Sequence, residues 1–204
     1  MTQDPQDYLK SYQEKIAANP ECGMTRYNYA VALVAQQNFD EAEVQLQQAV
    51  SCSPTLAEAY VLMGGICLQR NDLEGCLRYN QQATQVRPRF AEGYGNIGFI
   101  HLQQGDIDKA ITALEKAVNF NPKFLQAHAN LGNAYLMKGL IDKSIELNQK
   151  VLEMAPAFAV AHNNLAIAYL QKGDLAKARE HCDQAEAMGY KVAPEIKTEI
   201  NQKS

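Results

Sequence analysis

Several features that mark other classes of protein are missing from this chain of 204 residues. Tryptophan is absent, like charges never run five in a row, and no segment has the roughly 18 uninterrupted apolar residues that a membrane span needs. The first residues lack the basic-then-apolar order of a secretory signal. A net charge of −4 and a pI near 5.6 argue against nucleic acid or an anionic membrane as the main partner. We therefore expect a cytoplasmic protein that does not insert into membranes.

Sequence signatures of catalysis and of metal binding are missing too. The chain contains no GxGxxG, P-loop, GxSxG or HExxH pattern. Its five cysteines form no CxxC pair and, being odd in number, cannot all pair within one chain. We interpret them as reduced and mostly buried thiols. We expect no catalytic residue, no metal and no other cofactor.

A repeat organises what is present. Five prolines follow one another at intervals of 34 residues: Pro20, Pro54, Pro88, Pro122 and Pro156. Proline does not continue a helix, so each marks a boundary between helices. Midway between the prolines, Gln, Asn, Gly or Asp residues mark a tight turn, because Gly or Asn ends a helix and Asn or Asp caps the next one. Each unit is thus predicted to be two helices of about 12 to 14 residues.

Rows of residues taken one unit apart predict how these helices pack. One row is small in every unit, as is another in the following helix: Ala30, Gly64, Gly98, Gly132, Ala166 and Ala42, Cys76, Ala110, Ser144, Ala178. Glycine inside a helix costs about 1 kcal/mol against alanine, so its recurrence needs a packing reason. Small residues on both helices indicate close contact within a pair. Asn80 and Asn148 depart from the pattern, because they stand in a row that is expected to be apolar.

A 34-residue, two-helix repeat of this kind resembles the tetratricopeptide repeat (TPR) family, and residues 91–124 match its pattern best. The resemblance implies an all-α fold, a right-handed solenoid of antiparallel helix pairs. It implies five repeats, at 23–56, 57–90, 91–124, 125–158 and 159–192. Residues 1–22 are expected to form a half-repeat that caps one end, and residues 193–204 a helix that caps the other, because a solenoid must cover its terminal apolar faces.

The histidines fit this repeat without any metal. His128 and His162 fall in a row of large residues with Tyr60 and Tyr94, and neither has a Cys, Asp or Glu four residues later, as a metal site on one helix would need. We interpret both as packing residues. His101 belongs to another packing row, and His181 is expected to be a solvated side chain.

The asparagines suggest a binding surface. Asn28, Asn96, Asn130 and Asn164 share one row of the first helices, one residue before a large packing row, so the row should point away from the core. The TPR resemblance places this row inside the concave groove. An amide supplies both a donor and an acceptor, which suits the backbone of an extended peptide, although a purely structural amide is the alternative. The residues expected to contact a peptide are Asn28, Asn96, Asn130, Asn164, Tyr27, Val31, Glu58, Leu62, Glu92, Phe99, Asn133 and Asn163.

The neighbouring rows indicate which peptide would fit. They contain no Lys or Arg. TPR co-chaperones that bind an acidic C-terminal tail resemble one another in using Lys and Arg in these rows, so a clamp for an acidic tail is not expected here. Apolar residues edged by Glu58 and Glu92 favour a neutral or mildly basic peptide with apolar anchors. We expect a non-catalytic scaffold or adaptor for protein–protein interaction. One alternative is a structural protein that forms homo-oligomers through its N-terminal helix, where Tyr8 and Tyr12 lack a partner helix. Another is an accessory subunit that presents substrate to a separate enzyme.

Overall fold

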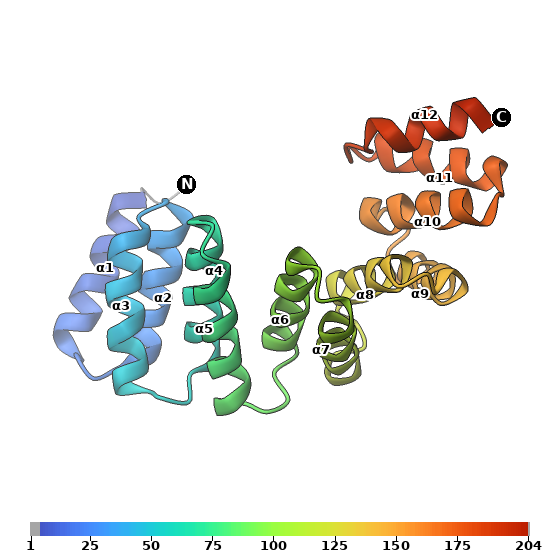
Figure 1. The fold of residues 1–204 in the computed structure, drawn as a ribbon. Helices are drawn as coiled ribbons and strands as arrows, with labels where there is room; N and C mark the ends of the chain where they lie inside the picture. Colours follow the sequence, from blue (N-terminus) through green and yellow to red (C-terminus); the bar gives the residue numbers. More distant parts are fainter. Residues whose placement is uncertain (1–4, 204) are drawn as a thin grey trace. The chain divides into compact units, whose positions relative to one another are not determined.

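A computed structural model describes residues 5–203, and within this range every regular element is an α-helix. The expected all-α fold is therefore confirmed (Figure 1). In chain order the helices are α1 (Pro5–Ala18), α2 (Gly23–Ala35), α3 (Phe39–Cys52), α4 (Ala57–Gln69), α5 (Leu73–Val86), α6 (Ala91–Gln104), α7 (Ile107–Phe120), α8 (Leu125–Met137), α9 (Ile141–Met154), α10 (Ala159–Lys172), α11 (Leu175–Ala187) and α12 (Pro194–Lys203). None of these helices is long and apolar enough to cross a bilayer.

The turns inside the helix pairs use a left-handed residue. Gly105, Gly139 and Gly173 have φ between 78° and 82°, whereas Gln37 and Asn71 adopt φ of 60° in the equivalent turns. The residue after the left-handed one donates its N–H back into the ended helix and so satisfies a terminal carbonyl, as the Asn38 N–H does to the Leu33 carbonyl at 2.9 Å. The next helix then begins at a side-chain cap in several repeats. Asp72 Oδ1, for example, accepts the N–H of Gly75 at 2.8 Å.

The small rows do bring the paired helices into close contact. Ala30 and Ala42 are fully buried, and so is Ala110. A Cβ placed on Gly98 would overlap the side chain of Leu114, and one on Gly64 would lie 2.5 Å from Nδ2 of Asn80. Glycine therefore stands in these helices because the facing side chain occupies the space that its own side chain would need.

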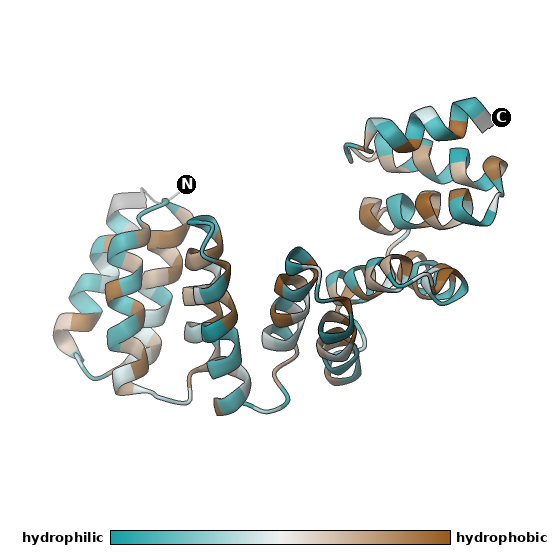
Figure 2. Cartoon of the chain, viewed as in Figure 1, coloured by the Kyte–Doolittle hydropathy of each residue, from teal (hydrophilic) through white to brown (hydrophobic). Residues whose placement is uncertain are grey.

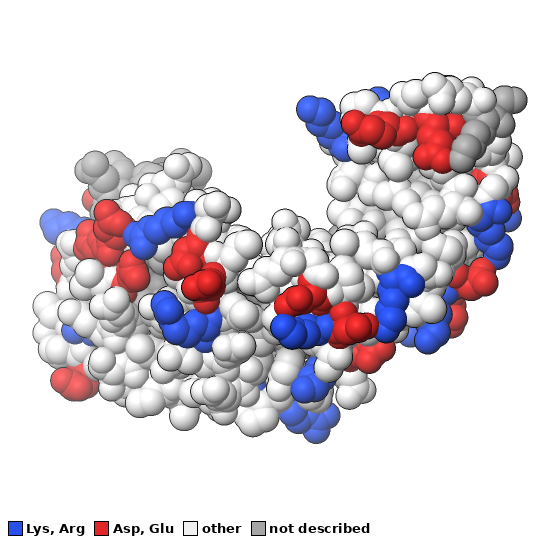
Figure 3. All heavy atoms as spheres, in the orientation of Figure 1, with Lys and Arg blue, Asp and Glu red and all other residues white. Residues whose placement is uncertain are grey.

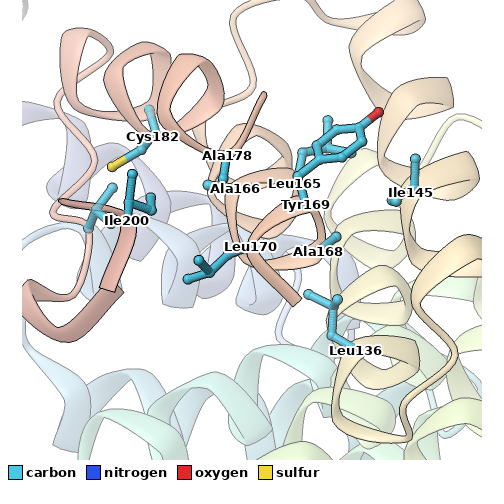
Figure 4. Packing of buried hydrophobic residues seen from close by; sticks show 12 residues of the cluster. Leu136, Ile145, Leu165, Ala166, Ala168, Tyr169, Leu170, Ala178, Cys182 and Ile200 are labelled. Carbon is cyan, nitrogen blue, oxygen red and sulfur yellow. The ribbon is translucent and has the colours of Figure 1, made fainter. Parts of the chain in front are cut away.

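The chain divides into two compact units, Met1–Asn96 and Ile97–Ser204, here called unit 1 and unit 2. In unit 1, α1 to α5 lie side by side (Figure 1), around a core that includes Leu33, Leu46 and Ile66. In unit 2, buried residues from α8 to α12 form one cluster around Leu165 and Leu170 (Figure 4). The helices carry both hydrophilic and hydrophobic residues, as is typical of amphipathic helices that pack through one face (Figure 2).

Helices at both ends of the chain pack onto the repeats. In α1, Tyr12 stacks on Tyr29 with 6.1 Å between ring centroids, and Gln13 Nε2 donates a hydrogen bond to the Tyr29 hydroxyl at 3.0 Å. Tyr12 is therefore half-buried, and the side chain of Tyr8 lies outside the described residues. In α12, Ile200 is 2% exposed within the core of unit 2. The apolar stripes of these two helices are thus used for packing within the chain.

On the face shown in Figure 3, charged side chains of both signs lie next to one another in groups that are separated by uncharged surface. Within each unit, a cation at the end of one first helix pairs with an acid at the start of the preceding second helix. Three such pairs measure 2.6 Å: Arg70–Asp40, Lys138–Asp108 and Lys172–Asp142. Exposed ion pairs contribute roughly 0–1 kcal/mol each, so they adjust the repeat packing and do not determine it.

Candidate functional site

Two neighbouring hollows on unit 1 share Leu62 and Gly65, and we call the surface that they form together the α2–α4 trough. The first hollow has a volume of about 490 Å³ and is lined by Tyr27, Glu58, Val61, Leu62, Gly65, Phe90, Glu92 and Asn96. The second has a volume of about 500 Å³ and is lined by Val34, Ala35, Gln37, Phe39, Leu62, Gly65, Ile66 and Gln69. Their shared wall makes the trough continuous along α4.

Helical spacing explains why these residues share a surface. The α4 side of the trough runs from Glu58 through Leu62 and Gly65 to Gln69, at steps of three or four residues that keep one face of a helix. On α2, Tyr27 and Val34 are seven residues apart on one face, and Val31 lies between them with 42% of its surface exposed. Most of this wall is apolar and open to solvent.

Charge gathers at one end of the trough. Arg87, the residue after α5, donates to both carboxylate oxygens of Glu58, at 2.6 and 2.9 Å, and its guanidinium lies 4.7 Å from the centre of the Phe90 ring. These hydrogen bonds lower the pKa of Glu58 and hold it ionised. Burial and the neighbouring Glu58 carboxylate raise the pKa of Tyr27. Glu92 is exposed and forms no ion pair within the described part of the chain, although its charge also acts on Arg87, so that Glu58, Glu92 and Arg87 together carry a net charge of −1.

The other end of the trough is neutral. Gln37 and Gln69 are both exposed there, at the turn after α2 and at the end of α4, and Phe39 lies half-buried below them. Gly65, between the two ends, is itself exposed, and a Cβ placed on it would meet no atom within 4 Å. The trough therefore has an acidic end, an apolar middle without a side chain at its centre, and a neutral polar end.

The asparagine row divides between the two units. In unit 1, Asn28 is exposed on α2, and Asn96 lines the first hollow of the trough. Asn96 Nδ2 donates to Oδ1 of the fully buried Asn80 at 2.9 Å, and Asn80 Nδ2 donates to the Cys76 carbonyl at 2.8 Å. The Asn96 side chain is thus bonded to the preceding helix, although the residue is half-buried and still lines the first hollow.

The expectation that the row points away from the core is wrong at Asn164. This residue is 3% exposed, and its Nδ2 donates to the Ala129 carbonyl at 2.9 Å and to Asn148 Oδ1 at 3.1 Å. The physical reason is that Asn148, which stands where the pattern calls for an apolar residue, presents an acceptor that needs a donor. Asn130, by contrast, is half-buried and accepts a hydrogen bond from Gln126 at 2.9 Å on the surface of α8.

The remaining predicted contact residues also lie in unit 2. Phe99 and Asn133 are half-buried on α6 and α8, and Asn163 is 9% exposed on α10. The trough is built from unit 1 alone and contains Tyr27, Glu58, Leu62, Glu92 and Asn96 of the predicted set, with Val31 exposed on the same face of α2.

Two histidines form part of the packing, as expected, but His181 is half-buried against other rings and is not the freely solvated side chain that was expected. Nε2 of His128 lies 2.9 Å from the Pro122 carbonyl, and Nε2 of His162 lies 3.1 Å from the Pro156 carbonyl. His181 Nδ1 lies 3.0 Å from Nδ1 of His162, and its ring stacks on Tyr169 at 5.6 Å. Burial, and then His162, lower the pKa of His181. No group of three or more potential metal ligands occurs among the described residues.

Two further hollows, both in unit 2, differ in character from the trough. One, of about 220 Å³ between α11 and α12, is lined mainly by charged residues, among them Arg179, Asp183 and Lys197. The other, of about 270 Å³, lies between α8 and α9, with Lys143, Glu146 and Lys150 in its wall. Both are smaller than either half of the trough and carry charges of both signs, so the trough is the stronger candidate for binding an apolar group.

The helix pairs and their repeating contacts define a class, the α-helical repeat proteins whose pairs stack into a solenoid. Within this class the chain belongs to the tetratricopeptide repeat family: sequence profiles described as TPR or tetratricopeptide repeat match residues 3–57, 100–139, 125–158 and 147–180. No curated protein sequence matches the chain. The family resemblance read from the prolines and small rows is therefore confirmed.

Solved structures share the fold at low sequence identity. YrrB, described as a TPR protein with an unusual peptide-binding site, is 18% identical, with a TM-score of 0.74, and the match covers 95% of this chain and 99% of that one. MamA is 22% identical, with a TM-score of 0.67 and coverage of 78% and 94%. PilF from Pseudomonas aeruginosa is 18% identical, with a TM-score of 0.75 and coverage of 84% and 78%. At these identities the likeness establishes the fold.

Sequence reasoning missed Arg87 and Phe90. Both lie at the junction between α5 and α6, flanking Pro88, whereas the rows that predicted the groove run only through first helices. The absence of Lys and Arg from those rows is correct, but Arg87 reaches Glu58 from outside them. The available signal was the aromatic Phe90 beside two arginines, Arg87 and Arg89, at this one repeat boundary.

Proposed function

We propose that this protein is an interaction module that binds a segment of another protein in the α2–α4 trough and acts by binding, without catalysis. The observation that carries the proposal is a solvent-open apolar surface, about 490 and 500 Å³ in its two halves, with charge confined to one end. Exposed apolar surface rimmed by polar residues is typical of protein interaction sites. The peptide-binding site named for the structurally similar YrrB supports the same kind of use.

The chemistry of the trough selects a partner that is apolar in the middle and basic at one end. Each large apolar side chain buried between α2 and α4 would contribute about 1.5–3 kcal/mol. A cation opposite Glu92 would add up to about 1 kcal/mol, because the site is exposed. After the cost of ordering the partner segment, two or three anchors correspond to an affinity in the micromolar range, about −8 kcal/mol.

We propose a secondary role for those asparagines that keep exposed surface. Asn28 is exposed on α2, and Asn130 and Asn133 are half-buried on α8. Their amides are available to hydrogen-bond a partner's backbone, and each such bond would contribute about 0.5–1.5 kcal/mol. Asn164 has almost no exposed surface, so its amide serves the fold in this proposal.

A matched pair of substitutions tests the proposal. Val31, which lies between Tyr27 and Val34 on the face of α2 that borders the trough, is 42% exposed, and Val44, on α3 and away from the trough, is 49% exposed. Val31→Glu places a charge against the apolar wall, whereas Val44→Glu makes the same chemical change at a site of similar exposure in the same unit. Tagged wild type and both variants would be used to capture proteins from the native lysate, with quantitative mass spectrometry and light scattering on the eluates.

We expect a set of proteins that Val44→Glu retains and Val31→Glu loses at least tenfold, which corresponds to about 1.4 kcal/mol. Equal capture by the two variants would exclude the trough as the binding surface. Recovery of the bait alone, in particles whose mass rises with concentration, would instead support self-assembly, and deletion of residues 1–20 would then test the N-terminal helix. Circular dichroism of both variants checks that the helices remain intact.

A further inference from the structure

We propose that the occupant of the α2–α4 trough is an amphipathic helix of the partner, which lies antiparallel to α4 and carries Lys or Arg in its last turn. The inference rests on the proposed function and specifies the class of ligand. An extended peptide is the alternative. The two ligands differ in the hydrogen bonds of their backbone N–H and C=O groups, in the spacing of their side chains and in how closely their backbones approach α4.

The polar groups of the partner's backbone argue for a helix. Along α2 and α4, the middle of the trough wall consists of apolar side chains and Gly65, and Glu58, Glu92, Gln37 and Gln69 lie toward its ends. The other polar groups in the lining are the Tyr27 hydroxyl and the Asn96 amide, whose Nδ2 is already bonded to Asn80. An extended segment would turn part of its N–H and C=O groups toward this wall without a hydrogen-bonding partner, which is unfavourable when water is excluded. A helix satisfies its own backbone and presents only side chains to the wall.

The dimensions of the trough match a short helix. On α4, the lining of the first hollow runs from Glu58 to Gly65, and the lining of the second runs from Leu62 to Gln69, four residues further along the helix. At 1.5 Å per residue, the whole lining of α4 spans about 16 Å, the length of about three turns. Apolar side chains of a partner helix at positions i, i+4 and i+7 would follow this lining and fill both hollows.

Gly65 provides the close approach that helix packing requires. Its neighbour Gly64 is a glycine because Asn80 occupies the adjacent space, but a Cβ on Gly65 would meet no atom of the described residues within 4 Å beyond its own stretch of helix. Nothing in the internal packing of unit 1 therefore requires a glycine at position 65, although glycine destabilises the middle of a helix. Helices pack with axes about 8–10 Å apart, and a position without a side chain at the crossing allows the short end of that range. Gly65 lies in the middle of the α4 lining, where such a crossing would fall.

The charge at one end sets the direction of the bound helix. Glu92 and the Glu58–Arg87 pair lie at the end of the trough where α4 begins. The negative end of a helix dipole is its C-terminus, which favours cationic side chains in the last turn and lies favourably beside the N-terminus of another helix. A partner helix that ends here, antiparallel to α4, would place a terminal Lys or Arg beside Glu92, which forms no ion pair with any residue from 5 to 203.

Selection from an unbiased peptide library tests the inference with the full chain. Random peptides of about 16 residues, long enough for a helix or an extended strand, would be displayed on phage and selected on the wild type, with counter-selection on Gly65→Leu. The Leu side chain would enter the open space over Gly65 and fill the middle of the trough. Selected peptides would be synthesised, their affinities measured by fluorescence anisotropy, and their helicity followed by circular dichroism on binding.

We expect selected peptides with apolar residues at helical spacing and Lys or Arg near the C-terminus, which gain helicity when bound and lose at least tenfold in affinity for Gly65→Leu. Glu92→Gln should weaken peptides with the terminal cation about two- to fivefold and leave their Lys→Gln versions unchanged. Peptides that depend on Gly65 but have alternating spacing, contain proline and stay non-helical would overturn the helix assignment while leaving the trough as a binding surface. If no selected peptide loses affinity for Gly65→Leu or for Val31→Glu, both the helix assignment and the proposed function of the trough are refuted. Should Gly65→Leu unfold, Gly65→Ala and Leu62→Glu serve the same comparison.

Discussion

Replacing Asn164 with alanine should destabilise unit 2, because the side chain links three elements of the core. Asn164 Nδ2 donates to the Ala129 carbonyl of α8 at 2.9 Å and to Asn148 Oδ1 of α9 at 3.1 Å. The Ala129 carbonyl keeps its bond within the helix, but Asn148 is fully buried and its Oδ1 would lose the donor. An unsatisfied buried acceptor costs about 1–3 kcal/mol, and the lost hydrogen bond to Ala129 adds about 0.5–1.5 kcal/mol.

The matched control for this substitution is Asn130→Ala. Asn130 occupies the equivalent position one repeat earlier, where it is half-buried and is bonded by Gln126 on the surface. Alanine is the better helix former at both positions by the same few tenths of a kcal/mol, so the difference between the variants isolates the buried hydrogen bonds. We expect the free energy of unfolding of Asn164→Ala to be lower than that of Asn130→Ala by about 2 kcal/mol or more.

Urea unfolding followed by circular dichroism measures the difference, and hydrogen exchange of the α9 and α10 amides shows whether the loss is local, since repeat proteins do not always unfold in one step. In the double variant with Asn148→Leu, which places there the residue found at Leu114, the penalty of Asn164→Ala should fall by at least about 1 kcal/mol, because no acceptor is left unpaired. Equal stability of the Asn164 and Asn130 variants, or no coupling to Asn148, would refute the reasoning.

Three further predictions follow from single positions. Gly65→Ala should raise the free energy of unfolding by up to about 1 kcal/mol, because its Cβ enters open space, whereas Gly64→Ala should lower it, because its Cβ would lie 2.5 Å from the Asn80 amide; thermal unfolding of both compares them. Gln37→Gly should stabilise the turn by about 1 kcal/mol, since Gln37 holds a φ of 60° that glycine adopts without strain, and urea titration measures the gain. The pKa of His181 is lowered in the folded state, so the unfolded state takes up the proton first: stability should fall as the pH drops below about 6.5 and through the lowered pKa, and less so in His181→Gln, as melting curves between pH 8 and 5 would show.

The repeat itself was predictable from the sequence because its signals are local and recur. Proline at five successive boundaries, Gly, Asn or Gln at the turn of each pair and a small residue at each helix contact act within a few residues, and each is repeated often enough to reveal its period. The family and the all-α fold follow from these alone. The glycine at position 64 was also correctly attributed to packing, although the identity of the side chain that it accommodates, Asn80, came only from the structure.

The candidate site was predictable only in part, because it depends on contacts between positions that no single row contains. Five of the predicted residues, Tyr27, Glu58, Leu62, Glu92 and Asn96, line the first hollow. Arg87 was missed because a loop residue has no fixed position in a helical row, and it changes the electrostatics by neutralising Glu58.

The asparagine row carries two different roles, and the residue 16 positions earlier tells them apart. Where a second helix has a buried asparagine, Asn80 or Asn148, the next first helix supplies an amide that donates to it: Asn96 to Asn80 and Asn164 to Asn148. Where that slot holds Leu114, the next amide, Asn130, has no such acceptor and stays at the surface, and Leu46 is followed by Leu62, which faces the trough. The row therefore recurs in the sequence without forming one binding surface, because two of its four asparagines, Asn96 and Asn164, donate a hydrogen bond to a buried asparagine of the core. The surface proposed for a partner therefore centres on the apolar stretch of α2 and α4 around Leu62 and Gly65, where the row holds a leucine in place of an asparagine and the next turn has no side chain, and Asn96 is the member of the row that also lines it.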